Sequence, residues 1–220
     1  MVFVTENSEG VAMKLVHVVL VASLGISSAV EAARQSPDPG AFQESYDQEA
    51  AGHNQEALAA LDKLSSEKNS SYVVLLRKAW LQHRLGRNAP AIEAYTKAIA
   101  VAPKAVEPRL GILLPLMAEK QWPAAEKHAR DVLKLDPGNY LATLRLAFVL
   151  YNEGKFSESE ALYQKVVDAY PSDPEAQSGL GWALLKLRKS KEAIVVFKAL
   201  LDFAPKNVLA QQGLAAAGAK

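Results

Sequence analysis

The chain contains no cysteine, which excludes disulfides, a redox Cys-x-x-Cys pair and a lipid-modified cysteine. It also lacks an excess of one charge: 25 Lys and Arg face 24 Asp and Glu, a net charge of +1 that is too weak to indicate nucleic-acid binding. No basic run with interleaved aromatics occurs. Phosphate-binding glycine loops, nucleophile elbows and metal-binding histidine pairs are absent from the sequence as well. We therefore expect no enzyme activity, no metal and no cofactor.

Charged residues are missing from one stretch near the N-terminus, between Leu15 and Val30. Lys14 precedes this apolar stretch and small residues follow it, which is typical of a secretory signal peptide. We predict a signal peptide over residues 1–32, cleaved after Ala32, with Met13 as an alternative start. The stretch is shorter than the roughly 20 residues of a membrane-spanning helix, so no stable span is expected after cleavage. We expect an exported protein of a bacterial periplasm; secretion and anchoring by an uncleaved signal are the alternatives.

Proline is sparse but regularly placed. An interval of 34 residues separates Pro103, Pro137, Pro171 and Pro205 in turn. A regular interval of this length indicates stacked helical hairpins, because two short helices and two turns need about that many residues. The predicted organisation after the signal peptide has a linker, five units, and a capping helix with a tail: 33–37, then 38–71, 72–105, 106–139, 140–173 and 174–207, then 208–220.

Equivalent places of these units carry similar residues. The twentieth place, where the two helices of a hairpin touch, is small in every unit: Ala57, Ala91, Ala125, Ser159 and Ala193. The twenty-fourth place is aromatic in three units and aliphatic in two: Tyr95, Tyr163 and Phe197, against Leu61 and Ala129. In these places the sequence resembles the tetratricopeptide repeat family over residues 38–207. The resemblance implies an all-α fold, a right-handed α-solenoid of five helix hairpins plus a C-terminal capping helix.

The turns inside the hairpins and one expected helix carry residues with special backbone requirements. Glycine stands in the turn of three units, at Gly52, Gly86 and Gly154, which predicts a left-handed C-cap. In the third unit Pro115 falls inside the first helix, where it removes a donor and clashes with the carbonyl of Gly111. We expect a kink there, which is either a hinge that re-aims the inner wall or an irregularity absorbed by packing.

The family resemblance also supplies candidate binding residues, since the first helices of such repeats line the inner, concave wall. The fifth, ninth, twelfth and thirteenth places of the units give the candidate partner-binding residues: Phe42, Tyr46, Leu76, Trp80, Arg84, Phe148, Tyr151, Trp182 and Lys186. Aromatic side chains are frequent binding hot spots, so a hydrophobic peptide or helix is expected along this wall. The same spacing is typical of a buried stripe, which leaves groove and core as alternatives.

Basic residues flank the candidate wall. Arg77 and Arg145 occupy the sixth place of their units, and they are interpreted either as clamps for acidic groups or as ordinary solvated residues. The resemblance as a whole implies a non-enzymatic scaffold or adaptor of the cell envelope, with a protein or peptide as its partner. A self-associating assembly protein that forms homo-oligomers, and an accessory subunit of an envelope enzyme complex, are the alternatives.

Overall fold

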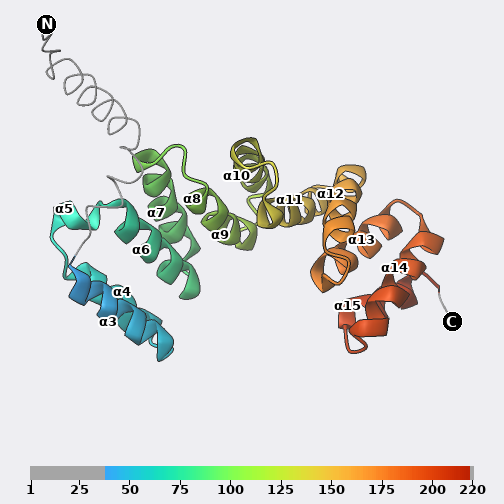
Figure 1. Ribbon diagram of the computed structural model, residues 1–220, viewed down its shortest axis with the longest axis horizontal. Helices are drawn as coiled ribbons and strands as arrows, with labels where there is room; N and C mark the ends of the chain where they lie inside the picture. Colours follow the sequence, from blue (N-terminus) through green and yellow to red (C-terminus); the bar gives the residue numbers. More distant parts are fainter. Residues whose placement is uncertain (1–37, 219–220) are drawn as a thin grey trace, which may run out of the picture.

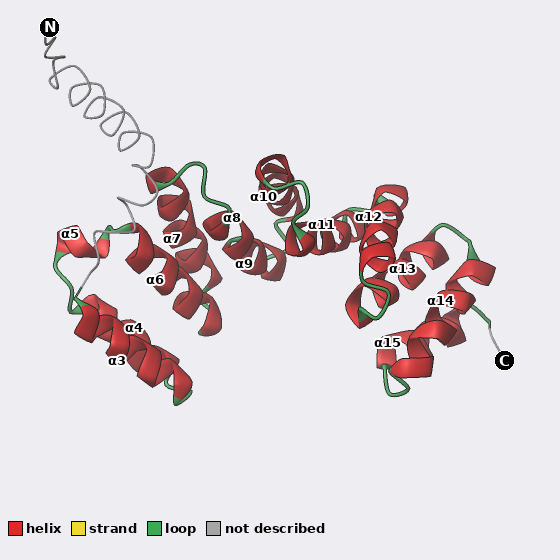
Figure 2. Cartoon of the chain, viewed as in Figure 1, coloured by secondary structure: helices red, strands yellow, loops and turns green. Residues whose placement is uncertain are grey.

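The computed structural model describes residues 38–218, and all regular structure within them is helical (Figures 1 and 2). The predicted signal peptide and linker lie outside the described residues. The helices are α3 Pro39–Ala50, α4 Asn54–Asp62, α5 Ser66–Asn69, α6 Tyr72–Arg84, α7 Asn88–Val101, α8 Glu107–Gly111, α9 Leu113–Ala118, α10 Trp122–Leu135, α11 Tyr140–Asn152, α12 Phe156–Ala169, α13 Pro174–Lys186, α14 Ser190–Phe203 and α15 Val208–Ala216. Within residues 38–218, no helix is both long and apolar enough to cross a membrane.

Consecutive helices pair into hairpins that stack into an open arch, with α3 and α4 at one end and α14 and α15 at the other (Figure 1). The core is correspondingly a chain of clusters along the arch. Each cluster joins neighbouring units: one around Leu61 and Val74, one around Leu113 and Leu146, and one around Leu180 and Phe197. A hairpin cannot bury both of its apolar faces alone, so stacking is what closes the core. The predicted all-α solenoid is confirmed.

The four regularly spaced prolines occupy equivalent corners. Each directly follows the C-cap residue of a second helix, and these C-cap residues have φ of −130°, −140°, −134° and −126°. This non-helical backbone is what a following proline favours, because the proline ring disfavours a helical conformation of the residue before it. The proline therefore ends α7, α10, α12 and α14 at the same point of each unit. In the first unit Asn69 replaces the proline, and the shorter α4 is followed by the extra helix α5.

The turns inside the hairpins have the predicted left-handed backbone. Gly52, Gly86 and Gly154 have φ of 83°, 73° and 79°. The other two units use the same conformation without glycine, since Lys120 and Arg188 have φ of 54° and 63°. For a residue with a Cβ atom this conformation costs roughly 1 to 2 kcal/mol, so these two turns are less stable than the same turns with glycine would be.

Aromatic side chains from second helices pack directly on glycines of the next unit. A Cβ atom built on Gly111 would lie 2.4 Å from the Tyr95 ring; the same atom on Gly179 would lie 2.3 Å from Tyr163. Gly213 of α15 meets Phe197 in the same way. The glycines therefore make room for the twenty-fourth-place aromatics, and α15 receives its aromatic as the first helix of a further unit would.

The two units without this aromatic are followed by a large residue where the others have glycine. Leu61 precedes a unit whose sixth place is Arg77, and Ala129 precedes one whose sixth place is Arg145. A smaller side chain at the twenty-fourth place of one unit is thus followed by a larger one at the sixth place of the next, as constant packing density requires. This complementarity is visible in the sequence only when the twenty-fourth place of one unit is compared with the sixth place of the next.

The expected break in the third unit is present. The first helix divides into α8, which ends at Gly111, and α9, which begins at Leu113, with Ile112 between them. Pro115 is buried, and Ile112 is 1% exposed. The proline removes one backbone donor, and the Tyr95 ring fills the space beside Gly111. The irregular segment is therefore packed into the core.

Candidate functional site

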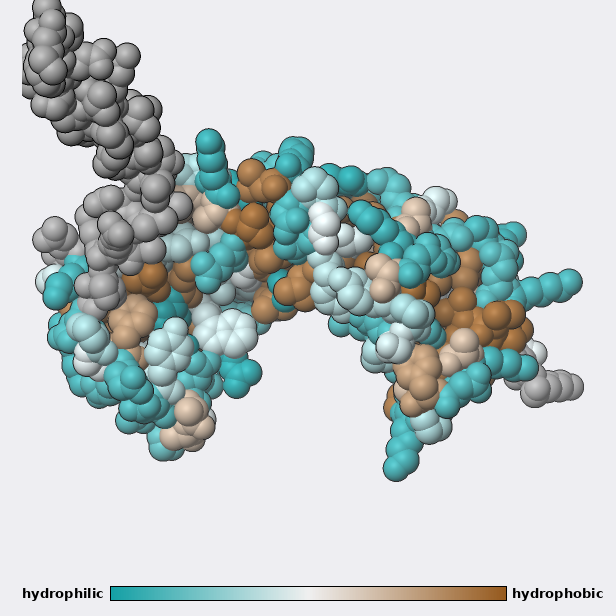
Figure 3. Space-filling view, in the orientation of Figure 1, coloured by the Kyte–Doolittle hydropathy of each residue, from teal (hydrophilic) through white to brown (hydrophobic). Residues whose placement is uncertain are grey.

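The arch is hollowed on one side (Figure 3). Two cavities contain most of the predicted binding residues, which divide between them. The N-terminal cavity, of about 290 Å³, lies along α3 and α6 and includes Phe42, Tyr46, Leu76 and Trp80. The C-terminal cavity, of about 650 Å³, includes these predicted residues: Phe148, Tyr151 and Trp182. Arg84 and Lys186 are exposed and are not among the residues that line either cavity.

Several of these side chains belong to both groove and core. Phe42 and Trp80 pack on the first core cluster, Leu76 packs on the second and Trp182 on the third, while all of them also line a cavity. Tyr46 and Phe148 are the more open ones, at 54% and 41% exposed. The two alternatives left by the sequence are therefore not exclusive in this fold.

The N-terminal cavity is built around a buried arginine. Arg77 is 6% exposed and donates from Nε to Ser45 Oγ at 3.1 Å and from Nη2 to the Ser45 carbonyl at 2.9 Å. Its guanidinium also pairs with Glu49 and lies 3.9 Å from the centroid of the Tyr46 ring. Both interpretations of Arg77 from the sequence were wrong: it is neither an open clamp nor a solvated residue, because the preceding unit supplies its partners.

The same carboxylate also engages the tryptophan of this cavity. The indole nitrogen of Trp80 donates to Glu49. Burial opposes ionisation of Glu49, but the hydrogen bonds from Trp80 and Arg77 outweigh it and hold the pKa of Glu49 below its usual value. The polar groups of the N-terminal cavity thus satisfy one another, and Trp80 offers a ligand only its ring.

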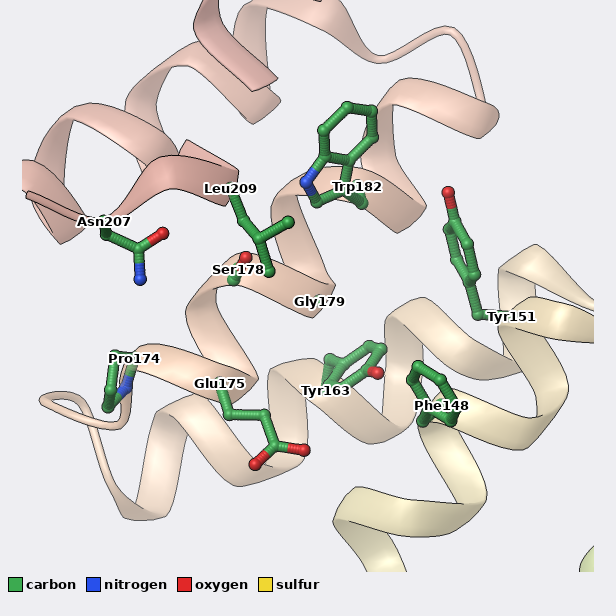
Figure 4. Close-up of a pocket in the computed structure, with 10 residues that line it drawn as sticks. All are labelled: Phe148, Tyr151, Tyr163, Pro174, Glu175, Ser178, Gly179, Trp182, Asn207 and Leu209. Carbon is green, nitrogen blue, oxygen red and sulfur yellow. The ribbon is translucent and has the colours of Figure 1, made fainter. Parts of the chain in front are cut away.

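The C-terminal cavity lies between the last two units and α15 (Figure 4). Phe148 and Tyr151 come from α11, Tyr163 from α12, and Glu175, Ser178, Gly179 and Trp182 from α13; Leu209 belongs to α15. Because Gly179 has no side chain, the buried Tyr163 ring reaches the cavity wall. This arrangement gathers aromatic rings from three consecutive helices around one opening.

Further rings support the aromatic walls from behind. Trp182 meets Phe197 edge to face at 6.0 Å between centroids, and Tyr151 meets Phe156 at 5.4 Å. Phe148 is held in the same way by Trp122 at 6.1 Å. Such edge contacts fix ring orientation and add roughly 0.5 to 1.5 kcal/mol each beyond burial. The cavity walls are therefore held in place before any ligand arrives.

Two polar atoms of this cavity remain unsatisfied, in contrast to those of the N-terminal cavity. The Ser178 hydroxyl, in a residue only 3% exposed, and the Trp182 indole nitrogen are buried and have no hydrogen-bond partner within residues 38–218. Glu175 forms no salt bridge with any described residue. Burial and the nearby Asp173 raise the pKa of Glu175, and Arg145 only partly opposes them. The cavity can thus supply apolar area and one carboxylate, and its walls contain two unsatisfied donors that are covered in this structure.

Sequence reasoning missed several of these residues, although a signal existed for some. Glu175 occupies the second place of its unit, a place that points into the groove in the resembling family. Leu209 occupies the same place if α15 is read as the start of a further unit. Tyr163 was noted only as the aromatic residue of the twenty-fourth place, and its reach into the cavity depends on Gly179. Metal binding has no support among residues 38–218, where no group of three or more acidic or histidine side chains could hold an ion.

A stack of helical hairpins with an open, aromatic inner surface defines a helical-repeat protein. Two family profiles described as tetratricopeptide repeat match the chain, one over residues 116–183 and 153–217 and the other over residues 72–104. Together these matches cover more than half of the sequence. The chain belongs to the tetratricopeptide repeat family.

Among curated proteins the chain is similar to the "Protein CTR9 homolog" of Arabidopsis thaliana, with 34% identity over 94 residues. The match covers 42% of this chain and only 9% of that protein. Among solved structures it is similar to MamA from Desulfovibrio magneticus RS-1, at a TM-score of 0.71, 18% identity, and coverage of 79% of this chain and 99% of that one. It is also similar to YrrB, a "TPR protein with an unusual peptide-binding site". That match has a TM-score of 0.68 and 17% identity, and it covers 84% of this chain and 95% of that one. At these identities the structural likeness shows the fold alone.

Proposed function

We propose that this protein is a non-enzymatic interaction scaffold that binds a hydrophobic segment of a protein partner on its concave face, chiefly in the C-terminal cavity. The observation that carries the proposal is the aromatic opening of about 650 Å³ formed by Phe148, Tyr151 and Trp182 together with Tyr163. Apolar cavities with few, well-placed polar groups are the usual form of a binding site. Trp and Tyr side chains in such pockets commonly dominate binding energy.

The N-terminal cavity takes a secondary part in this proposal. Phe42, Tyr46, Leu76 and Trp80 supply apolar contact area, but the polar groups around them are already paired within the chain. Arg84 and Lys186 stay on the exposed rim as weak contributors, since exposed charges contribute little to affinity. Peptide binding by YrrB, a protein of the same fold, adds support for this kind of ligand.

Site-specific photocrosslinking tests this proposal. A photoreactive amino acid at position 209 would lie at the cavity, where Leu209 is 54% exposed. The matched control is position 195, because Val195 is also a well-exposed apolar residue, at 67%, and does not line the cavity. We expect partner adducts in cells or extracts of the native host from position 209 and not from position 195. Equal adducts from both positions, or adducts from position 195 alone, would contradict the proposal.

Self-association is a second candidate, favoured by apolar side chains exposed at the C-terminal end of the stack. Phe203, at the end of α14, and Val208 and Leu209, at the start of α15, are 47%, 59% and 54% exposed, and exposed apolar side chains often mark a contact surface. Light scattering over a concentration series distinguishes the candidates. A monomer at every concentration eliminates self-association and leaves the scaffold proposal in place.

We also propose that the protein acts outside the cytoplasm. The proposal rests on the uncharged stretch from Leu15 to Val30 followed by small residues. Cell fractionation with N-terminal sequencing of the purified protein tests it, and the expected mature chain begins at Ala33. A cytoplasmic protein that retains Leu15 would contradict it.

A further inference from the structure

We propose that the ligand of the C-terminal cavity is an extended peptide that places a lysine or arginine side chain against Glu175 and an apolar side chain on the aromatic walls. The inference rests on the proposed scaffold function and specifies its ligand. Three features of the cavity carry it: its charge, its rings and its unsatisfied donors.

The negative charge of the cavity favours a cationic group on the ligand. Of the described residues that line it, Glu175 is the only charged one, and it has no ion-pair partner within residues 38–218. Asp173 adds negative charge beside it. Arg145 of α11 attracts the carboxylate but donates to the Leu110 carbonyl and forms no salt bridge with Glu175. Burial raises the pKa of Glu175, so the carboxylate is stabilised by a cation that enters the cavity. An acidic peptide would instead meet like charge.

The rings favour a cation with an apolar stem. Phe148, Tyr151, Tyr163 and Trp182 line the same opening as Glu175 (Figure 4). The negative face of an aromatic ring attracts lysine and arginine head groups, and their methylene stems cover apolar surface. A lysine or arginine side chain therefore matches a carboxylate set among rings better than an apolar side chain alone does.

The unsatisfied donors favour an extended backbone. Ser178 and Trp182 are one turn apart on α13, which separates their Cα atoms by about 6 Å along the helix axis. Carbonyls on one side of an extended chain recur every second residue, at about 6.7 Å. Both donor atoms are covered in this structure, so a ligand must first displace the side chains over them. The Ser178 hydroxyl and the Trp182 indole nitrogen can then donate to two such carbonyls of one peptide. A helical ligand has free carbonyls only in its last turn, so along the rest of its length it would offer these donors no well-placed acceptor.

Selection from a random-peptide display library on the immobilised protein is the first test. We expect the enriched peptides to carry lysine or arginine beside an apolar residue, and to be competed by one another. If peptides are enriched without a basic residue, the charge part of this proposal is wrong while the scaffold proposal stands. If no peptide binds at all, the scaffold proposal itself fails.

Variants then test the contacts, with affinity of an enriched, fluorescently labelled peptide as the measurement. Glu175→Gln is expected to weaken binding about fivefold, in the range of an ion pair with ring contacts. Asp202→Asn, the same change of charge at an exposed residue of α14 away from the cavity, should leave affinity unchanged. Circular dichroism checks that each variant is folded. Equal affinity of Glu175→Gln and wild type would overturn the role of the carboxylate.

Ser178→Ala tests the extended backbone separately. It should weaken binding severalfold, because one donor to the ligand is lost. A peptide that prefers a helical conformation when bound, measured by isotope-edited spectroscopy, would overturn the extended geometry, as would unchanged affinity of the Ser178→Ala variant.

Discussion

Replacing Gly179 with alanine should destabilise the protein, although alanine is the better helix former. The substitution in α13 would gain about 1 kcal/mol of helix propensity. The new Cβ atom would however lie 2.3, 2.5 and 2.7 Å from three carbons of the Tyr163 ring. That ring is 3% exposed and enclosed by the core, so it cannot move aside freely. Overpacking of this kind costs roughly 1 to 3 kcal/mol, and a contact this short lies at the upper end, so we expect a net loss of about 1 to 2 kcal/mol.

Urea denaturation followed by circular dichroism measures this effect. Gly138→Ala is the matched control, because a Cβ atom there would lie 3.8 Å from the nearest atom, Asp136 Oδ1, and should be tolerated. Tyr163→Leu, which installs the leucine that the first unit has at the same place, should relieve the clash in a double mutant. The double-mutant cycle should give a coupling of about 1 kcal/mol or more. A Gly179→Ala variant as stable as wild type, or no coupling, would refute the packing argument.

Two further predictions concern the turns and the surface charges. Lys120→Gly and Arg188→Gly should each stabilise the protein by about 1 kcal/mol in thermal denaturation, because glycine adopts the left-handed backbone without cost; a lower melting temperature for both would contradict this. Glu126 receives hydrogen bonds from Lys155 and Arg130, which hold its pKa at about 2, below the usual 4.5. A lowered pKa means that these contacts stabilise the fold above about pH 4.5 and are lost as the pH falls toward 2. The Glu126→Gln variant should therefore have a lower free energy of unfolding than wild type at neutral pH, and this free energy should fall less on acidification. The same pH dependence of unfolding in variant and wild type would contradict the prediction.

The fold was predictable because its signals are local. A proline that disfavours a helical residue before it, and a glycine that permits a left-handed turn, act within a few residues of their own positions. These signals placed the corners at Pro103 and its equivalents and the turns at Gly52, Gly86 and Gly154. The use of Lys120 and Arg188 in the same conformation was not predictable from residue type, because neither residue favours a positive φ.

The candidate site was predictable only in part, because its properties depend on contacts between units. The resemblance brought attention to Phe148, Tyr151 and Trp182, which do line one cavity. It could not show that Arg77 and Trp80 both donate hydrogen bonds to Glu49, which belongs to the preceding unit. Only the structure therefore shows that the polar groups of the N-terminal cavity are hydrogen-bonded, whereas two polar atoms of the C-terminal cavity are not.

The indole resonances of the protein test the central claim, that the C-terminal cavity is the binding surface, most directly. The chain has three tryptophans, so the indole N–H region of a proton–nitrogen correlation spectrum of the labelled protein gives a small set of signals, assigned by Trp→Phe substitution. On addition of an enriched peptide, the Trp182 signal should shift most, because its N–H gains an acceptor. The Trp80 signal should stay in place, because its N–H remains bonded to Glu49. A peptide that shifts Trp80 and leaves Trp182 unchanged would contradict the account.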